Sequence, residues 1–198
     1  MTQQATPILV FAGSTRKNSY NRRLAQVAVA LAQEAGAAVT LLELASLDIP
    51  LYNADLEAQG TPADVIRLKE LLDTHPGWII CTPEYNGSYP ALLKNVLDWA
   101  SSPVASHPVW RDGSKPFAGK VVGLMSASPG ALGGLRALSH LTPLLINLQC
   151  WVSPQQFALS HAAQAFDANN QLEAPQRARV HAVVNSVRWA AGRLGASD

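Results

Sequence analysis

Short apolar runs alternate with longer segments of helical period along this 198-residue chain, and this alternation constrains the fold more than any other feature. Ile8–Ala12 is apolar throughout, which is typical of a parallel strand covered on both faces. Further runs predict strands at 39–44, 78–81, 121–125 and from 150 onward. Helical periods between and after them predict helices through 24–36 and 61–72, over 90–100 and 132–148, and through 180–194.

Five strands that alternate with helices predict one α/β domain, a parallel sheet with helices on both faces. Residues 1–6 precede the first strand, and we expect them to be flexible. Residues 101–119 are rich in Ser, Pro and Gly and predict a long loop before the fourth strand. Doubly wound sheets bind ligands in the crevice beyond the carboxyl ends of their strands. We therefore expect the functional residues directly after the first, third and fourth strands.

Composition argues against several classes of function. Apolar residues make up 48% and charged residues 15%, which argues against disorder, and the net charge of +1 offers no attraction for nucleic acid or an anionic membrane. No stretch approaches the roughly 20 apolar residues of a membrane span, and the first residues show no secretory signal. Cys81 and Cys150 lie in apolar runs, as buried thiols do in a reducing cytosol. We expect a cytoplasmic protein, without a metal site because its histidines lack ligand spacing.

The loop after the first strand, Gly13–Asn21, is rich in hydroxyl and amide side chains. Free N–H groups at a helix start bind phosphate well, and the dipole of the helix adds to the attraction. The side chains that could add bonds or charge are Ser14, Thr15, Arg16, Ser19 and Asn21. A simple helix cap is the alternative, but a cap needs only one such residue. Neither the P-loop nor the dinucleotide pattern of glycines is present, so a phosphate monoester is favoured.

The loop after the third strand, Thr82–Pro90, places an aromatic, an amide and a carboxylate on a backbone restricted by two prolines. Such a loop could present backbone groups to the edge of a flat heterocycle, or it could be an ordinary turn into the next helix. The residues alone leave both interpretations open.

Two motifs decide between them. Gly-Ser-x-Arg-x-x-Ser-x-Asn at 13–21 and Thr-Pro-Glu-Tyr-Asn-x-Ser-x-Pro-x-x-Leu-Lys-Asn-x-x-Asp-Trp at 82–99 resemble the NAD(P)H-dependent FMN reductase family. That family includes flavin, quinone, azo-dye and chromate reductases. The resemblance runs from Ile8 to about the last helix, and it implies a flavodoxin-like doubly wound five-stranded parallel sheet with helices on both faces. It also implies a bound FMN, which would take hydride from NADPH or NADH and pass electrons to a small-molecule acceptor.

The resemblance assigns site residues as well. It places the FMN phosphate at Ser14, Arg16, Ser19 and Asn21, and the flavin ring against Pro83, Glu84, Tyr85 and Asn86. The loop 126–134 matches a third family segment, in which Ser128, Gly130 and Gly133 would approach the ring, although a plain turn remains the alternative. Tyr52 could line the acceptor pocket or simply pack. The cofactor carries out the chemistry, so no side chain is assigned as catalytic.

Residues 101–116 depart from the family, because they are longer and more polar than the connection expected in quinone reductases. His107, Trp110 and Arg111 lie there, and we expect them to alter substrate access. The family typically forms homodimers and homotetramers, and Trp99 with Trp110 suggests an interface. An electron carrier of the flavodoxin type and a ligand-binding module without turnover remain as alternatives. The choice between NADH and NADPH stays open, because Arg22, Arg23, Arg111 and Arg136 could each meet a 2′-phosphate.

Overall fold

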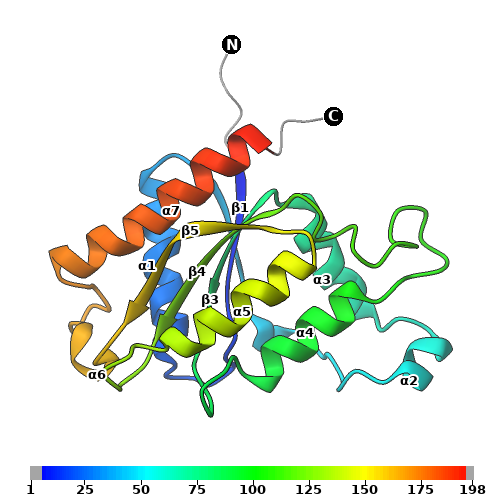
Figure 1. The fold of residues 1–198 in the computed structure, drawn as a ribbon, viewed down its shortest axis with the longest axis horizontal. Coiled ribbons are helices and arrows are strands. Elements are labelled where there is room, and N and C mark those ends of the chain that lie inside the picture. The colour runs from blue at the N-terminus through cyan, green and yellow to red at the C-terminus, as the bar shows by residue number, and fades with distance from the viewer. Residues whose placement is uncertain (1–5, 195–198) are drawn as a thin grey trace.

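A five-stranded parallel sheet forms the centre of the molecule in the computed structural model, which describes residues 6–194 (Figure 1). Its strands are β1 (Pro7–Ala12), β2 (Ala38–Leu42), β3 (Gly77–Cys81), β4 (Val121–Ala127) and β5 (Trp151–Leu159). The spatial order is β2-β1-β3-β4-β5, with every neighbouring pair parallel. This is the flavodoxin-like order, so the predicted fold class is confirmed. Residues 1–5 of the segment predicted to be flexible lie outside the described residues.

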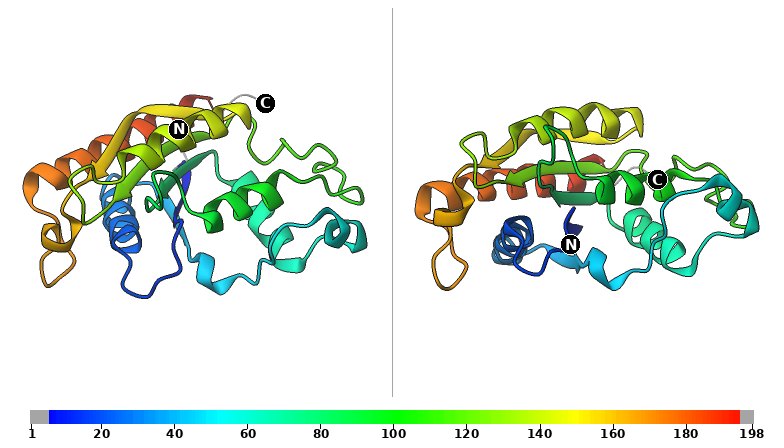
Figure 2. Two further views of the ribbon diagram at one scale, coloured as in Figure 1. Left: turned by 60° about the horizontal axis from the view of Figure 1, so that its bottom comes forward. Right: turned by 90° about the horizontal axis from the view of Figure 1, so that it is seen from below.

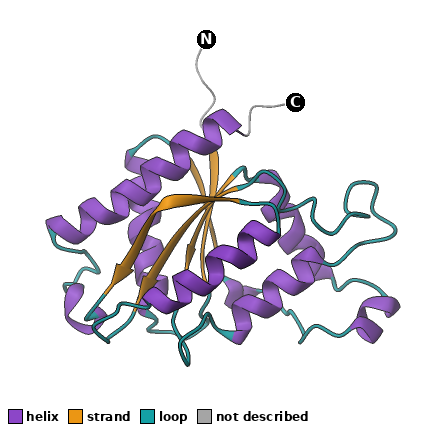
Figure 3. Ribbon diagram, in the orientation of Figure 1, coloured by secondary structure: helices purple, strands orange, loops and turns teal. Residues whose placement is uncertain are grey.

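Helices cover both faces of the sheet (Figure 3). The helices are α1 (Tyr20–Glu34), α2 (Ala54–Gln59), α3 (Ala63–Thr74), α4 (Ala91–Ser101), α5 (Leu135–Asn147), α6 (Ala162–Ala165) and α7 (Ala174–Leu194). Helices α1 and α7 pack on one face, and α3, α4 and α5 pack on the other (Figure 2). Alternate residues of β1 divide between these two cores, as the period of two in a strand requires.

The short helices α2 and α6 were not predicted, because neither is long enough to show a helical period. Helix α2 has Asn53 as its N-cap, whose side chain accepts the N–H of Asp55 at 2.8 Å. Helix α5 contains Pro143 in its interior. The carbonyl that Pro143 would have bonded belongs to Ser139, which is exposed, so water can satisfy it and the helix continues.

The long loop from Ser102 to Lys120 lies at the amino end of the sheet, opposite the crevice. Val121 at its end donates its N–H to Pro76, just before β3, and Gly119 donates to Gln149, just before β5. The predicted loop is therefore confirmed, whereas its effect on substrate access stays a prediction. A connection from a helix into the next parallel strand must return to the edge where the strands begin.

Both tryptophans expected at an interface are buried within the chain. Trp99 is fully buried and Trp110 is 3% exposed. Trp110 donates its indole N–H to Asp73 on α3 at 2.9 Å and stacks on His107. These two side chains fix the long loop and helix α4 in place and are not available to another subunit. Cys81 and Cys150 are buried and free, and burial raises the pKa of the Cys150 thiol to about 12.

Candidate functional site

Three loops meet around a cavity of about 300 Å³ at the carboxyl ends of β1, β3 and β4. These are the three loops that the sequence predicted. The cavity is lined by Ser14, Arg16, Ser19, Tyr20, Asn21, Pro83, Glu84, Tyr85, Ala127, Ser128 and Pro129. Eight of the eleven predicted site residues therefore line one cavity, and Asn86, Gly130 and Gly133 do not.

The loop before α1 forms the polar end of the cavity. Ser19 caps α1 by accepting the N–H of Arg22 at 3.4 Å. Within the described part of the chain, the backbone N–H groups of Thr15, Lys17 and Asn18 meet no acceptor. Arg16 is exposed, with its guanidinium 5.4 Å from the ring centre of Tyr20. Free N–H groups, a capped helix start and an available cation are the features that a phosphate monoester needs.

Asn21 has a different environment from the other residues of this loop. Its side-chain amide donates to the carbonyl of Ala127 at 2.9 Å, and its oxygen accepts the N–H of Ala127 at 2.9 Å. Both groups are buried. Asn21 therefore joins the start of α1 to the end of β4, and it holds two walls of the cavity at a fixed distance.

The loop after β3 turns sharply beside the cavity. Tyr85 and Ser88 exchange two backbone hydrogen bonds, of 2.9 and 3.0 Å, across the central pair Asn86–Gly87. Both central residues have positive φ, 52° and 79°, as a type I′ turn requires. The Asn-Gly pair explains why this turn forms, and the turn leaves Tyr85 55% exposed at the mouth of the cavity.

The carboxylate of Glu84 is held by the start of helix α5. The Arg136 guanidinium donates to Glu84 Oε1 at 2.7 Å through Nε, and the backbone N–H of Arg136 donates to Oε2 at 3.0 Å. Burial alone would raise the pKa of Glu84, but the Arg136 side chain and the N–H groups of Arg136 and Ala137 outweigh it and lower the pKa. Glu84 is therefore a fixed anion in the cavity wall. From the sequence alone, Arg136 was only a possible contact for a 2′-phosphate.

Two glycines close the loop between β4 and α5. A Cβ on Gly134 would lie 1.8 Å from Ser126 Oγ, and a Cβ on Gly133 would lie 2.7 Å from the backbone of Leu159 and Ser160. The hydroxyl of Ser126 donates to the carbonyl of Thr82 at 2.6 Å, so this loop is tied to the loop after β3. The structure thus gives Gly133 a packing contact with the end of β5.

Two further motif residues, Asn95 and Trp99, hold the loop after β2. Asn95 donates to the carbonyl of Pro50 at 2.9 Å and accepts the N–H of Tyr52 at 2.7 Å, and the indole of Trp99 also donates to Pro50. The ring of Tyr52 packs edge-on against Trp99, and its hydroxyl donates to Glu57 at 2.7 Å. The sequence analysis did not predict this shared contact, although the spacing of Asn95 and Trp99, one helical turn apart, is a signal that could have indicated it. The packing interpretation of Tyr52 is the one these contacts support.

The geometry suits FMN. A cavity with a cation and free N–H groups at one end and Pro83–Tyr85 at the other can hold a phosphate and a flat ring, respectively. No helix within residues 6–194 is long and apolar enough to cross a membrane. In the same range, no group of three or more His, Cys, Asp or Glu side chains is placed to hold a metal ion.

Comparison with known proteins agrees with this geometry. Residues 6–164 match the family described as NADPH-dependent FMN reductase. An NAD(P)H-dependent FMN reductase from Pseudomonas aeruginosa is 36% identical over 83% of each chain. A quinone reductase from Escherichia coli K12 is 39% identical over 73% of this chain and 72% of its own. The solved structure of a flavoenzyme NAD(P)H:(acceptor) oxidoreductase from Paracoccus denitrificans superposes with a TM-score of 0.80, at 29% identity, covering 96% of this chain and 99% of that one.

Proposed function

This chain belongs to the NADPH-dependent FMN reductase family, and from that premise we propose that it reduces small quinone-type acceptors with electrons from NAD(P)H. As a member of that family it is an oxidoreductase, with FMN as cofactor and NAD(P)H as co-substrate. The observation that carries the proposal is the cavity formed by the three loops, in which the family motifs of 13–21 and 82–90 face each other.

We assign the phosphate of FMN to the start of α1. Ser14 and Ser19 would donate their hydroxyls, Arg16 would supply the positive charge, and the free N–H groups of the loop would complete the set. Asn21 would act as a positioning residue through Ala127. The segment Pro83–Asn86 and Ser128 would hold the edge of the ring. When bound, FMN supplies hydride acceptance and two-electron transfer.

A comparison of FMN with riboflavin tests the assignment of the phosphate. Each charge-assisted hydrogen bond contributes roughly 1.5–3 kcal/mol, so FMN should bind at least a hundredfold more tightly than riboflavin. Titration of the apoprotein with each flavin, followed by flavin fluorescence, measures the difference. Equal affinities would contradict a phosphate site in the loop 13–21.

Quinones are the acceptors that the names of several relatives specify. Proteins described as quinone reductases from Escherichia coli and Pseudomonas putida are 39% and 33% identical to this chain. A 2-hydroxy-1,4-benzoquinone reductase from a Burkholderia species is 32% identical. A panel of quinones, free flavins, azo dyes and chromate, run with NADH and with NADPH, should give the highest kcat/KM with a quinone. A holoprotein that oxidises neither nucleotide would be a carrier or a binding module instead.

We also propose that the chain forms a homo-oligomer. Because Trp99 and Trp110 are buried within the subunit, the contact must use other side chains. Large apolar side chains are exposed on α5, on the edge strand β5 and on α7, namely Ile146, Trp151 and Trp189. Light scattering should give at least twice the chain mass of 21.1 kDa. A monomer mass at micromolar concentration would contradict the proposal.

A further inference from the structure

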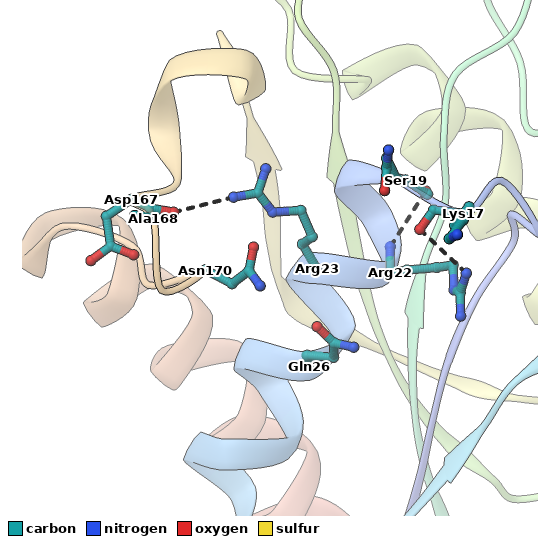
Figure 4. A pocket seen from close by; sticks show the side chains of 9 residues that line it. Lys17, Ser19, Arg22, Arg23, Gln26, Asp167, Ala168 and Asn170 are labelled. Atoms are coloured by element: carbon teal, nitrogen blue, oxygen red, sulfur yellow. Dashed lines mark hydrogen bonds between the residues drawn. The ribbon is translucent and has the colours of Figure 1, made fainter.

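A second cavity adjoins the flavin cavity at the start of α1. It has a volume of about 430 Å³ and lies between the first turns of α1 and the segment 167–170 (Figure 4). Its lining includes Lys17, Ser19, Arg22, Arg23, Asp167 and Asn170. Ser19 lines both cavities, so the second cavity begins where the phosphate of FMN would end.

The structure separates the four arginines that could meet a 2′-phosphate. Arg22 is paired with Glu43 through two contacts of 2.9 and 3.0 Å. Arg136 is committed to Glu84. Arg111 lies in the loop 102–120 at the amino end of the sheet, away from the crevice. Of these four arginines, Arg23 alone both has no carboxylate partner among the described residues and lies beside the flavin cavity.

Most N–H groups of the Arg23 guanidinium have no acceptor within the described residues. It makes one long hydrogen bond, of 3.4 Å, to the carbonyl of Asp167, and its guanidinium lies 4.4 Å from the ring centre of Phe166. Its Nε–H is buried and has no acceptor within the part of the chain that the structure describes. Lys17, on the other side of the cavity, is exposed, and no salt bridge to it occurs within residues 6–194.

The single carboxylate on the wall does not neutralise these cations. Oδ1 of Asp167 accepts the N–H groups of Asn169 and Gln171 at 2.8 and 2.7 Å, which fixes the turn of the wall. In Figure 4 this carboxylate points away from the guanidinium of Arg23. The wall therefore presents two cations that no carboxylate pairs within the described residues, Lys17 and Arg23, together with several amide groups. This combination suits an anion with several oxygens.

We infer that this cavity receives the 2′-phosphate of NADPH, so that Lys17 and Arg23 give the enzyme a preference for NADPH over NADH. The inference rests on the proposed function. A nicotinamide that reaches the ring beside Tyr85 belongs to a ligand longer than FMN, and the rest of that ligand must extend past the flavin. The second cavity is the adjoining cationic space, and an arginine is the usual partner of a 2′-phosphate.

Binding of two nucleotides that differ only in the 2′-phosphate tests the inference. Calorimetry on the FMN-loaded protein should show that 2′,5′-ADP binds at least tenfold more tightly than 5′-AMP. The variant Lys17→Gln should lose part of this difference, and Lys17→Gln/Arg23→Gln should lose most of it, with FMN content unchanged. Arg111→Gln, which removes an exposed arginine at the far end of the sheet, serves as the matched control and should keep the difference. Equal affinity of the wild type for both nucleotides would overturn the inference.

Steady-state rates separate the inference from the proposed function. In the double variant kcat/KM should fall about tenfold or more for NADPH and stay within twofold for NADH. An equal fall for both would overturn the 2′-phosphate assignment and leave the reductase intact. Binding of inorganic phosphate as tight as that of 2′,5′-ADP, with no preference for NADPH, would show a free-phosphate site instead. A wild-type holoprotein that oxidises neither nucleotide would refute the proposed function itself.

Discussion

At the scale of single residues, Arg16 is the cation that the flavin cavity offers for a phosphate. Its side chain is exposed and approaches only the ring of Tyr20. Arg16→Ala should weaken FMN binding about ten- to a hundredfold, because it removes a charge-assisted contact. Turnover at saturating FMN should change little, since the proposed role of Arg16 is to hold the phosphate and not to take part in the chemistry. Lys17→Ala is the matched control, because the neighbouring side chain faces the other cavity, and its FMN affinity should stay that of the wild type.

A collapse of turnover in Arg16→Ala with the site full of FMN would contradict this division of roles. Added salt offers a second check. Screening should weaken FMN binding in the wild type more than in the variant, because the variant has one charge fewer to screen.

Glu84 and Arg136 form an ion pair, and a substitution of Arg136 should change the stability of the fold and its dependence on pH. The pKa of Glu84 is lowered in the folded chain, so its stabilising contribution is present above the unfolded value of about 4.3 and is lost as the pH falls through the lower folded value. Arg136→Gln removes the guanidinium and leaves burial to raise that pKa. We expect a loss of roughly 0.5–1 kcal/mol at pH 7 and acid unfolding that begins at higher pH. Urea titrations of the wild type and of Arg136→Gln between pH 3 and 7 measure both quantities. If the two proteins give the same stability at every pH, Arg136 does not lower the pKa of Glu84.

Single residues also show how far the sequence could predict the site. The motifs identified eight residues that line one cavity. Hydroxyl side chains, a cation and prolines in the loops that follow strands are together typical of a ligand-binding site and of few other structures. They could not distinguish Asn21 from Ser19, since an amide can bind a phosphate or a backbone equally well. That choice depends on Ala127, 106 residues away along the chain, and only the fold brings the two together.

At the scale of elements, α3 holds both the end of α4 and the long loop through buried polar contacts. Lys69 is buried and donates to the carbonyls of Ala100 and Ser102 at 2.7 and 2.6 Å. A cation at the carboxyl end of a helix is stabilised by the helix dipole and by the carbonyls that have no helical donor. The burial of Lys69 was not predicted, because a lysine is rarely buried unless its ammonium group has partners.

Lys69→Met should lower the free energy of unfolding by about 1–3 kcal/mol, because two carbonyls lose their donor. Burial lowers the pKa of Lys69 to about 8, against about 10.4 in an unfolded chain. Between these values the unfolded state binds more protons, so the wild type gains stability as the pH rises. The variant lacks this gain. Denaturant titrations at pH 7 and pH 9.5 should therefore show a larger gap between the two proteins at the higher pH, whereas a constant gap would argue against the lowered pKa.

The long loop shows the limit of reasoning from similarity alone. Ser, Pro and Gly at 101–119 predicted its length, and His107, Trp110 and Arg111 suggested an effect on substrate access. The order of the elements along the chain predicts a different location for the end of this loop, because a loop that follows α4 must return to the amino end of β4. Trp110 then finds its partner on α3, in Asp73, and contributes to packing at the far end of the sheet.

At the scale of the whole molecule, the sheet brings every predicted polar loop to one edge. The strand order places β1 between β2 and β3 and beside the point where the chain reverses direction, and crevices form at such points. Alternating apolar runs predicted a parallel sheet, the resemblance implied its flavodoxin-like topology, and the motifs predicted which loops would form the site. The second cavity was not predictable, because residues 167–170 reach α1 only through the path of the chain after β5.

This arrangement leads to a prediction about kinetics. The walls of the flavin cavity are fixed by Asn21 on one side and by Glu84 with Arg136 on the other, which leaves the mouth beside Tyr85 as the route to the ring. The nicotinamide and the quinone both need contact with the ring, so they must occupy that mouth in turn. Double-reciprocal plots with NADPH and a quinone as the varied substrates should therefore give parallel lines, the pattern of a ping-pong mechanism.

The same geometry predicts which kinetic pattern would contradict the proposal that the nicotinamide and the quinone bind in turn. Intersecting lines would require both substrates to be bound at once and so would require a second surface close to the ring. Within one subunit the end of the loop 102–120 lies at the amino edge of the sheet, opposite the crevice. The second cavity lies at the phosphate end and would hold part of the nucleotide that has to leave before the acceptor enters. A quinone should accordingly compete with NADP⁺ for the reduced enzyme, and 2′,5′-ADP should inhibit against NADPH while leaving the quinone half of the reaction nearly unaffected.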